Sequence, residues 1–495
     1  MKKYLSIAFT CLLLSIFIFV AVKRYALGSV RYFDPDEFMY VNWAYHVFSG
    51  NVPYKDFMMI ASPLYVVFLA PLFMVWSGID AVAIARVIAF LLSIFLAGAI
   101  GVAYWTTHKS WVAIVPATIL LILPMPSDKL LEIRPDILAL LIFLIGFREV
   151  LLFWSKQGKP TQLFWGGVWL STSLLVLQKT GVLVATVAGM VIFSALVTKK
   201  LRAVPVFLLG LGLPLGSFSL WALTTGQAKT VFYSVTWLTK ESILGVARFN
   251  PLGPTFFFSP NPTYYGESGL SIGLIVNHTL WVLALILAAA LIMTNAVEWR
   301  KEWYIRMTPA LLLVASVIQY LYISPLKFTQ YLLPAAVFVA WFTGEWVELL
   351  WRLCKRSHAR LATFTIFFVL FTMLMTYTFF RVHSPKFNWT NDSTYQKITR
   401  ILATIPKNEY VFDLEGRTIY YPYPYYVCCL PIGQFDSLLL KSRPPIREAL
   451  RTTKTKYIYQ AEIPRIRALP PEDLAFIREN YTETEGGDLL VAKYW

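Results

Sequence analysis

The feature that most constrains this chain is a series of apolar runs, each close to the length that crosses a membrane. The first extends from Leu5 to Val22, and ten more follow at about 81–105, 111–125, 137–154, 163–178, 181–198, 203–224, 270–295, 307–323, 328–351 and 361–380. With 57% hydrophobic and only 15% charged residues, the composition excludes a soluble globular enzyme, a disordered chain and a collagen-like fibre. A span needs about 20 residues, so the shorter runs must include flanking residues, and we predict an α-helical polytopic membrane protein with about 11 transmembrane helices.

Basic residues are distributed unevenly between the connections, and this distribution predicts the topology. The stretch from Pro63 to Trp76 is ambiguous between a span and a helix on the membrane surface. If it does not cross, the later basic clusters share the side of the N-terminus: His108–Lys109, Lys156–Lys159, Lys199–Arg202, Arg300–Arg306 and Arg352–Arg360. Because cytoplasmic loops are rich in Lys and Arg, we predict a cytoplasmic N-terminus and an outer 63–76 helix. An inner (plasma) membrane fits this arrangement best, with the endoplasmic reticulum left open. The net charge of +16 then reflects basic loops and anionic lipid rather than nucleic acid.

The chain divides into two predicted domains. Residues 1–380 form the transmembrane domain, with a long outer loop at about 25–80, and residues 381–495 form a small extracytoplasmic domain. This tail mixes strand-like runs such as Leu489–Ala492 with helix-like runs such as Pro471–Asn480, which predicts an α/β fold. The chain has no Walker or dinucleotide glycine motif, so a nucleotide-driven pump is disfavoured.

Three acids stand where the first span meets the outer loop: Asp34, Asp36 and Glu37. One interpretation is structural, because Asp34 suits a helix N-cap, Pro35 the first helical position and Glu37 the third, which together make a capping box. This interpretation explains Asp34 and Glu37 better than Asp36, whose position offers only a favourable interaction with the helix dipole.

Other charged residues gather at predicted outer turns or span ends: Glu132, Arg134, Asp136, Lys179 and Lys327. Charges at the hydrocarbon boundary are costly and are usually paired or functional, although long side chains can also extend to the interface. Cations on the outer side run against the bias that sets the topology. If acids and cations meet in one outer cavity, they suit a transfer reaction in which a carboxylate takes a proton and cations hold a phosphate leaving group.

Several of these motifs resemble those of the GT-C glycosyltransferases, and most closely the protein O-mannosyltransferase and lipid A aminoarabinose transferase group (glycosyltransferase family 39-like). The matching segments follow one another in order over roughly residues 1–350: Asp36–Tyr40, Gly50–Phe57, Ser62–Tyr65, Ala85–Arg86, Arg134–Asp136, Gln178–Gly181, and Lys327 with Tyr331–Pro334. Two departures stand out. Ser62 replaces the first proline of a Pro-Pro-Leu-Tyr-like segment, and valines stand where a late proline is expected.

The resemblance implies a GT-C fold and an inverting transfer of a sugar from a polyprenyl-phosphate carrier to an extracytoplasmic glycan, lipid or protein. It also implies roles for particular residues. Asp36 and Glu37 are the expected catalytic residues, with Asp36 as the general base. Glu37, Asp136 and Tyr40 would orient the acceptor or the base, or bind a metal. The carrier phosphate is expected to contact Lys179, Lys327, Arg134 and Tyr331. No cofactor follows with certainty, and a divalent cation stays open.

A second function class is a transporter or flippase for a lipid-linked glycan, or a protein that assists glycan assembly. Transporters place ionisable residues near the membrane midplane and often consist of repeated halves. Here the candidate residues lie at the predicted outer boundary and the chain has no visible repeat. The pattern therefore favours the transferase.

Overall fold

The computed structural model describes residues 2–155, 158–238, 240, 244, 245, 247, 252–298, 303–426, 445–460 and 465–494. Parts of two predicted basic clusters, Lys156 and Arg300–Lys301, lie outside the described residues. Within the described chain, nine helical segments are long and apolar enough to cross a membrane. They contain α1 (Lys2–Val30), α4 (Asp80–His108), α7 (Pro135–Trp154), α9 (Gly181–Val197), α10 (Ala203–Thr224), α14 (Ile272–Glu298), α15 (Trp303–Ile318), α16 (Leu333–Cys354) and α17 (His358–His383).

The two remaining predicted spans are helical but irregular. The segment Trp111–Ile122, which includes α5 (Ile114–Ile122), continues into Pro124–Leu131 after a bend of 92°. Prolines at 124 and 126 account for this break, because proline donates no backbone hydrogen bond and clashes with the preceding turn. The other, α8 (Pro160–Val176), has 17 residues, which is short for a span. All eleven apolar runs are thus helical, and the predicted polytopic helical fold is confirmed.

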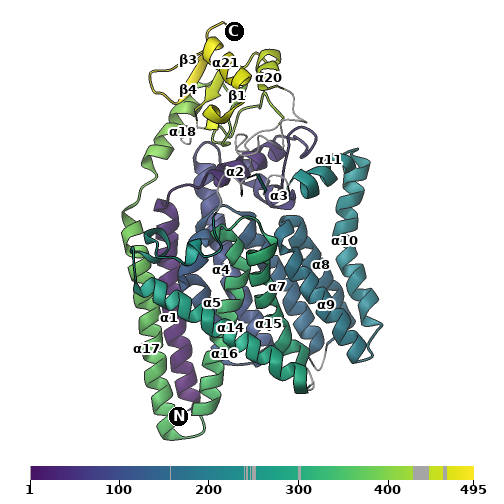
Figure 1. The fold of residues 1–495 in the computed structure, drawn as a ribbon, viewed down its shortest axis with the longest axis vertical. Coiled ribbons are helices and arrows are strands. Elements are labelled where there is room, and N and C mark those ends of the chain that lie inside the picture. The colour runs from purple at the N-terminus through teal and green to yellow at the C-terminus, as the bar shows by residue number, and fades with distance from the viewer. Residues whose placement is uncertain are drawn as a thin grey trace.

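Short helices and the C-terminal domain lie at one end of the bundle, which we call the domain-bearing end. Figure 1 shows α2 (Pro35–Phe48) and α3 (Leu64–Leu69) there, with the C-terminal domain beyond them and the N-terminus at the opposite end. The apolar helix Leu64–Met74, formed by α3 and the 3-10 turn η1 (Ala70–Met74), is shorter than a span. Short helices α11 (Ala228–Phe232) and α13 (Pro262–Tyr265) complete the loops.

The C-terminal domain is built around a four-stranded sheet in the order β1-β2-β4-β3. β1 pairs with β2 in parallel, whereas β4 is antiparallel to both β2 and β3, with Ile458 opposite Leu490. Its elements are α18 (Asp392–Thr404), β1 (Val411–Phe412), α20 (Ile446–Thr452), β2 (Tyr457–Tyr459), α21 (Pro471–Asn480), β3 (Tyr481–Glu483) and β4 (Leu489–Ala492). The predicted small C-terminal α/β fold is therefore confirmed.

The segment after β1 attaches this domain to the loop that contains α2. The Arg417 guanidinium lies 5.0 Å from the ring centroid of Phe38 on α2. The Tyr426 hydroxyl donates to the Tyr54 carbonyl at 2.6 Å, and the Met58 amide donates to the Tyr426 carbonyl at 3.0 Å. The domain therefore packs directly against the segment that carries the three sequence-predicted acids.

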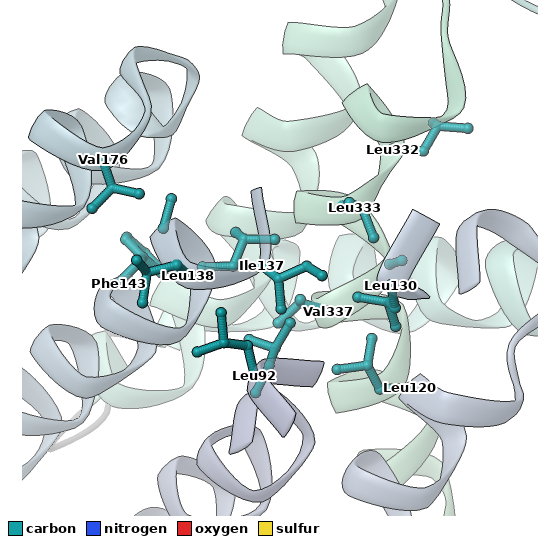
Figure 2. Close-up of a cluster of buried hydrophobic side chains, with 14 of the residues drawn as sticks. Leu92, Leu120, Leu130, Ile137, Leu138, Phe143, Val176, Leu332, Leu333 and Val337 are labelled. Atoms are coloured by element: carbon teal, nitrogen blue, oxygen red, sulfur yellow. The ribbon is translucent and has the colours of Figure 1, made fainter. Parts of the chain in front are cut away.

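The bundle is packed tightly below this region. Figure 2 shows buried side chains from α4, α7, α8 and α16, among them Leu92, Ile137, Val176 and Leu333, meeting in one apolar cluster. α8 and α10 approach closely through glycines, since a Cβ on Gly167 would lie 2.5 Å from the Phe207 carbonyl oxygen. This close packing fixes the positions of the first residues of α7 and of the turns before α9 and α16.

Candidate functional site

The acids that follow the first span begin α2, and two of them form the predicted capping box. The Asp34 carboxylate accepts a hydrogen bond from the Asp36 amide at 3.0 Å, and the Asp34 amide donates to Glu37 Oε1 at 2.9 Å. Glu37 is fully buried, and Arg86 on α4 donates to its two oxygens at 3.0 and 2.8 Å. The Ile133 amide donates to Glu37 Oε2 at 3.0 Å. Glu37 therefore joins α2 to α4 and to the turn before α7, and its oxygens are already bound.

Asp36 faces a different environment from its neighbour. Its side chain is 44% exposed, and one carboxylate oxygen lies 3.0 Å from Nη1 of Arg134. Surrounding protein atoms desolvate the carboxylate and raise the pKa of Asp36, while the charge of Arg134 works against that rise. Burial alone would also raise the pKa of Asp34, but Lys129 and Arg134 outweigh it and hold that pKa below its usual range. Asp34 and Asp36, two residues apart, thus differ in pKa, and Asp36 is the better proton acceptor.

Arg134 stands at the centre of a group of side chains that we call the Arg134 cluster: Asp36, Arg134, Asp136 and Lys179. Arg134 Nε lies 3.5 Å from Asp136 Oδ2, and the other oxygen of Asp136 pairs with the Lys179 ammonium. The side chain of Lys179 is 16% exposed and its ammonium lies 4.5 Å from the ring centroid of Tyr331. The cluster therefore joins the start of α2, the start of α7 and the 3-10 turns before α9 and α16.

Tyrosines surround the cluster. Tyr40 and Tyr65 are buried and contact each other edge to face, with ring centroids 5.4 Å apart. Burial raises the pKa of both phenols, and the charges of Asp136 and Arg134 also act on both. Both tyrosines therefore remain protonated and can donate hydrogen bonds. The sequence predicted no role for Tyr65, although the residue belongs to the Ser62–Tyr65 segment, one of the motifs that carry the resemblance.

Lys327 does not join these side chains. Its ammonium donates to the carbonyls of Tyr320, Leu321 and Ser324 at 2.6, 3.0 and 2.6 Å. Those carbonyls belong to the end of the helical segment that continues α15, which leaves unpaired backbone acceptors. The structure thus brings together six predicted site residues, whereas the polar atoms of Lys327 and Glu37 are engaged elsewhere. The six are Asp36, Tyr40, Arg134, Asp136, Lys179 and Tyr331.

A second set of charges lies behind the Arg134 cluster, and we call it the Arg31 network: Arg31, Asp128, Lys129, Glu132 and Lys386. Arg31 donates to Asp128 Oδ2 through Nε and Nη2 at 3.0 and 2.9 Å and pairs with Glu132. Lys386 reaches the other oxygen of Asp128 at 3.3 Å. The second oxygen of Glu132 accepts from Arg134 Nη1 at 3.2 Å. The Arg31 network therefore fixes the position of Arg134 through Glu132.

Asp128, Lys129 and Lys386 had no predicted role in a site. For Asp128 and Lys129 the sequence signal was the presence of charges next to apolar runs, which favours pairing in the folded protein, whereas Lys386 stands in a polar stretch and gave no such signal. In the part of the chain that the structure describes, no group of three or more His, Cys, Asp or Glu side chains is arranged to hold a metal ion.

An apolar groove of about 550 Å³ lies between α3, α8 and α10. Leu64 and Val67 of α3 form one wall, Pro214 and Trp221 of α10 form another, and Leu175 of α8 lies between them. None of the residues that line the groove is charged. Leu175, at the end of α8, precedes Lys179 by four residues, so the groove and the Arg134 cluster both use this stretch of the chain.

No protein-family model and no curated protein matches this sequence, but several solved structures match its fold. ArnT from Cupriavidus metallidurans bound to undecaprenyl phosphate matches over 97% of each chain with a TM-score of 0.61 and 12% identity. The apo structure of that protein matches over 83% of this chain and 84% of its own, with a TM-score of 0.55 and 12% identity.

A further match is the oligosaccharyltransferase AglB from Archaeoglobus fulgidus in complex with an inhibitory peptide and a dolichol-phosphate. It covers 100% of this chain and 75% of its own, with a TM-score of 0.54 and 12% identity. At these identities the likeness concerns the fold. It confirms the GT-C fold expected from the motifs.

Proposed function

We propose that this protein is a membrane glycosyltransferase that moves a sugar from a polyprenyl-phosphate carrier to an acceptor at the domain-bearing end. The observation that carries the proposal is the Arg134 cluster, in which a half-exposed carboxylate lies next to cations at the ends of spans. Two proteins of similar fold supply independent support, because their structures contain undecaprenyl phosphate and a dolichol-phosphate.

Asp36 is the proposed general base. An acceptor hydroxyl oxygen attacks the anomeric carbon, its proton passes to Asp36, and the bond from that carbon to the carrier phosphate breaks, which inverts the configuration. The raised pKa of Asp36 makes it a stronger base than an ordinary aspartate, while Arg134 keeps it ionised near neutral pH. The proposed mechanism contains no metal step, since Asp36 and Asp136 are each paired with a cation.

Lys179 and Arg134 are the proposed ligands of the carrier phosphate. Both side chains are fixed by Asp136, so their charges are in place before the leaving group develops its own. Tyr331 lies against Lys179, and Tyr40 and Tyr65 can donate hydrogen bonds to the sugar or the phosphate. Glu37 takes a positioning role in this proposal, because it orients the first turn of α2.

The apolar groove between α3 and α10 is the proposed place of the carrier's isoprenyl chain. Burial of an isoprenyl chain stabilises the complex by about 25 cal/mol per Å² of apolar surface. The groove has no charged residue in its lining, so binding of the chain would bury no charge. The domain-bearing end is the proposed extracytoplasmic side of an inner (plasma) membrane. In support, the N-terminal lysines and the basic connection between α16 and α17 lie at the opposite end (Figure 1).

The test uses purified protein in nanodiscs, a panel of undecaprenyl-phosphate sugars labelled in the sugar, and an envelope-glycan extract. We expect label to move to the acceptor with release of undecaprenyl phosphate. We also expect Lys179→Gln to raise the KM for the donor by about tenfold to a hundredfold, the usual cost of one charged contact. Wild-type protein that neither binds undecaprenyl phosphate nor releases sugar overturns the proposal. Passage of intact donor across a vesicle bilayer without sugar release identifies a transporter instead.

A further inference from the structure

A second cavity, of about 510 Å³, lies in the C-terminal domain. It is formed by the 3-10 turn Arg465–Ala468, by α21 and by the strands β3 and β4. Leu474, Ile477 and Leu490 give it an apolar lining. Figure 1 shows these elements in the part of the molecule farthest from the transmembrane helices. The cavity therefore faces the aqueous phase at the domain-bearing end.

Charge distinguishes this cavity from the apolar groove. Its lining includes three guanidinium groups, from Arg465, Arg467 and Arg478, and a single acid, Glu483. Arg467 and Arg478 are exposed, and neither forms an ion pair with any residue that the structure describes. Arg465 lies near Glu415, but the exposed charges of Arg467 and Arg478 outnumber the single acid of the lining. Arginine binds carboxylates and phosphates in a two-pronged geometry, so this excess of positive charge favours an anionic ligand.

Arg465 connects the cavity to the Arg134 cluster. It donates to the Leu414 carbonyl at 2.9 Å and lies 3.7 Å from Glu415, close to the Arg417 side chain that packs over Phe38 of α2. Burial raises the pKa of Asp36, and the charge of Arg465, after that of Arg134, counteracts the rise. Arg465, one residue of the cavity lining, is thus linked through Glu415 and Arg417 to the first turns of α2, which carry the proposed general base. In the proposed reaction the general base contacts the acceptor rather than the carrier.

We propose that Arg465, Arg467 and Arg478 form an anion-binding subsite for the acceptor, which is a glycan bearing carboxylate or phosphate groups. The inference rests on the proposed function, and it adds to it the chemical class of the acceptor. A glycan is favoured over a lipid headgroup because the cavity is set in the outer part of the C-terminal domain and not at the ends of the spans. The amide of Gln460 in the same lining can donate hydrogen bonds to a sugar and accept them from it.

The binding experiment uses full-length protein in phosphatidylcholine nanodiscs. Trigalacturonate is the carboxylate probe, inorganic phosphate is the phosphate probe, and maltotriose is the neutral control. We expect wild type to bind trigalacturonate or phosphate but not maltotriose, and R467Q/R478Q to weaken that binding by about tenfold or more. R467K/R478K keeps the charge and should recover most of the affinity. The matched control K407Q/K454Q removes two exposed cations of the same domain outside the cavity, and it should bind as wild type does.

The outcomes separate this inference from the proposed function. Equal binding by wild type and R467Q/R478Q, or equal loss in K407Q/K454Q, overturns the subsite even if Lys179→Gln still impairs transfer. If the arginine variant instead loses affinity only for phosphatidylglycerol nanodiscs, the cavity binds a lipid headgroup and the glycan inference is wrong. Binding that requires Arg467 and Arg478 supports the subsite even in the absence of sugar transfer, whose failure would count against the proposed function alone. In transfer assays we expect R467Q/R478Q to raise the KM for an anionic acceptor and to leave undecaprenyl phosphate binding unchanged.

Discussion

The Arg31 network and the Arg134 cluster are joined through Glu132 and Arg134, and both combine carboxylates with arginine and lysine, but they differ in their access to solvent. Arg31, Asp128 and Glu132 are buried, and each acid accepts from two or more cationic donors. In the Arg134 cluster, Asp36 is half exposed and Lys179 is in part accessible. Buried and saturated ion pairs hold elements together, because removing one partner leaves an uncompensated charge. An accessible acid beside a fixed cation retains the capacity to exchange a proton or meet a ligand.

The same contrast separates two consecutive residues of α2. Glu37 points into the bundle and binds Arg86, whereas Asp36 points toward Arg134 and solvent. A resemblance based on the Asp-Glu pair treats both acids as candidates for chemistry. In the structure Glu37 is a buried partner of Arg86, whereas Asp36 is accessible to a ligand. Each of the following predictions tests one part of this difference.

The largest effect is expected for Asp36→Asn. Loss of a general base typically slows a reaction by about 10²–10⁴-fold, so sugar transfer should fall by this factor. The Tm should stay the same or rise, since the raised pKa of Asp36 means that its ionised form is disfavoured in the folded protein at neutral pH. Initial transfer rates and thermal unfolding of the same preparation check both statements. Transfer at the wild-type rate would exclude Asp36 as the base.

Glu37→Gln should act in the opposite way. It removes the counter-charge of buried Arg86, which typically costs about 3–5 kcal/mol of folding free energy. We expect a lower yield of folded protein and a lower Tm, with near-normal affinity for undecaprenyl phosphate in the molecules that fold. Thermal unfolding and binding on size-selected protein make the comparison. A stable Glu37→Gln protein that has lost transfer would place Glu37 in the reaction.

Some of these features are predictable from the sequence because they depend on local patterns. Spans follow from hydropathy over a single segment, and the capping box at Asp34 and Glu37 follows from residues three positions apart. The order of the short motifs is sufficient to identify the fold. The bend after Ile122 is harder to predict from the sequence, because the apolar run continues past it although the prolines interrupt the helix.

The remaining features depend on partners that are distant in the chain. Asp128 meets Lys386, which lies 258 residues later, and Lys179 meets Asp136 across two helices. No local pattern tells which of the many charges will be paired, so Lys179 and Lys327 look equivalent in the sequence. Only the packed structure separates the lysine beside Asp136 from the lysine that binds backbone carbonyls.

The pH dependence of sugar transfer tests the role of Asp36, the solvent-accessible acid of the Arg134 cluster. A base must be deprotonated, so activity should be full above the pKa of Asp36 and should fall about tenfold per pH unit below it. Because burial raises this pKa, the fall should begin at a higher pH than for an ordinary aspartate. Arg134→Gln removes the charge that opposes the rise, and it should move the acid limb to still higher pH. A profile of kcat/KM without an acid limb, or one that Arg134→Gln shifts toward lower pH, contradicts this role.

The smallest effect is expected for Lys327→Gln, which is the matched control for Lys179→Gln. Lys327 binds three carbonyls at the end of a helical segment, and a glutamine amide can replace only part of these bonds. The cost should be about 1 kcal/mol of folding free energy, the usual net value of a hydrogen bond. Donor affinity should change little, because the ammonium of Lys327 is already occupied by backbone acceptors. If Lys327→Gln instead weakens undecaprenyl phosphate binding as strongly as Lys179→Gln, both lysines contact the carrier phosphate, and the boundary between structural and accessible charges must be redrawn to include the turn before α16.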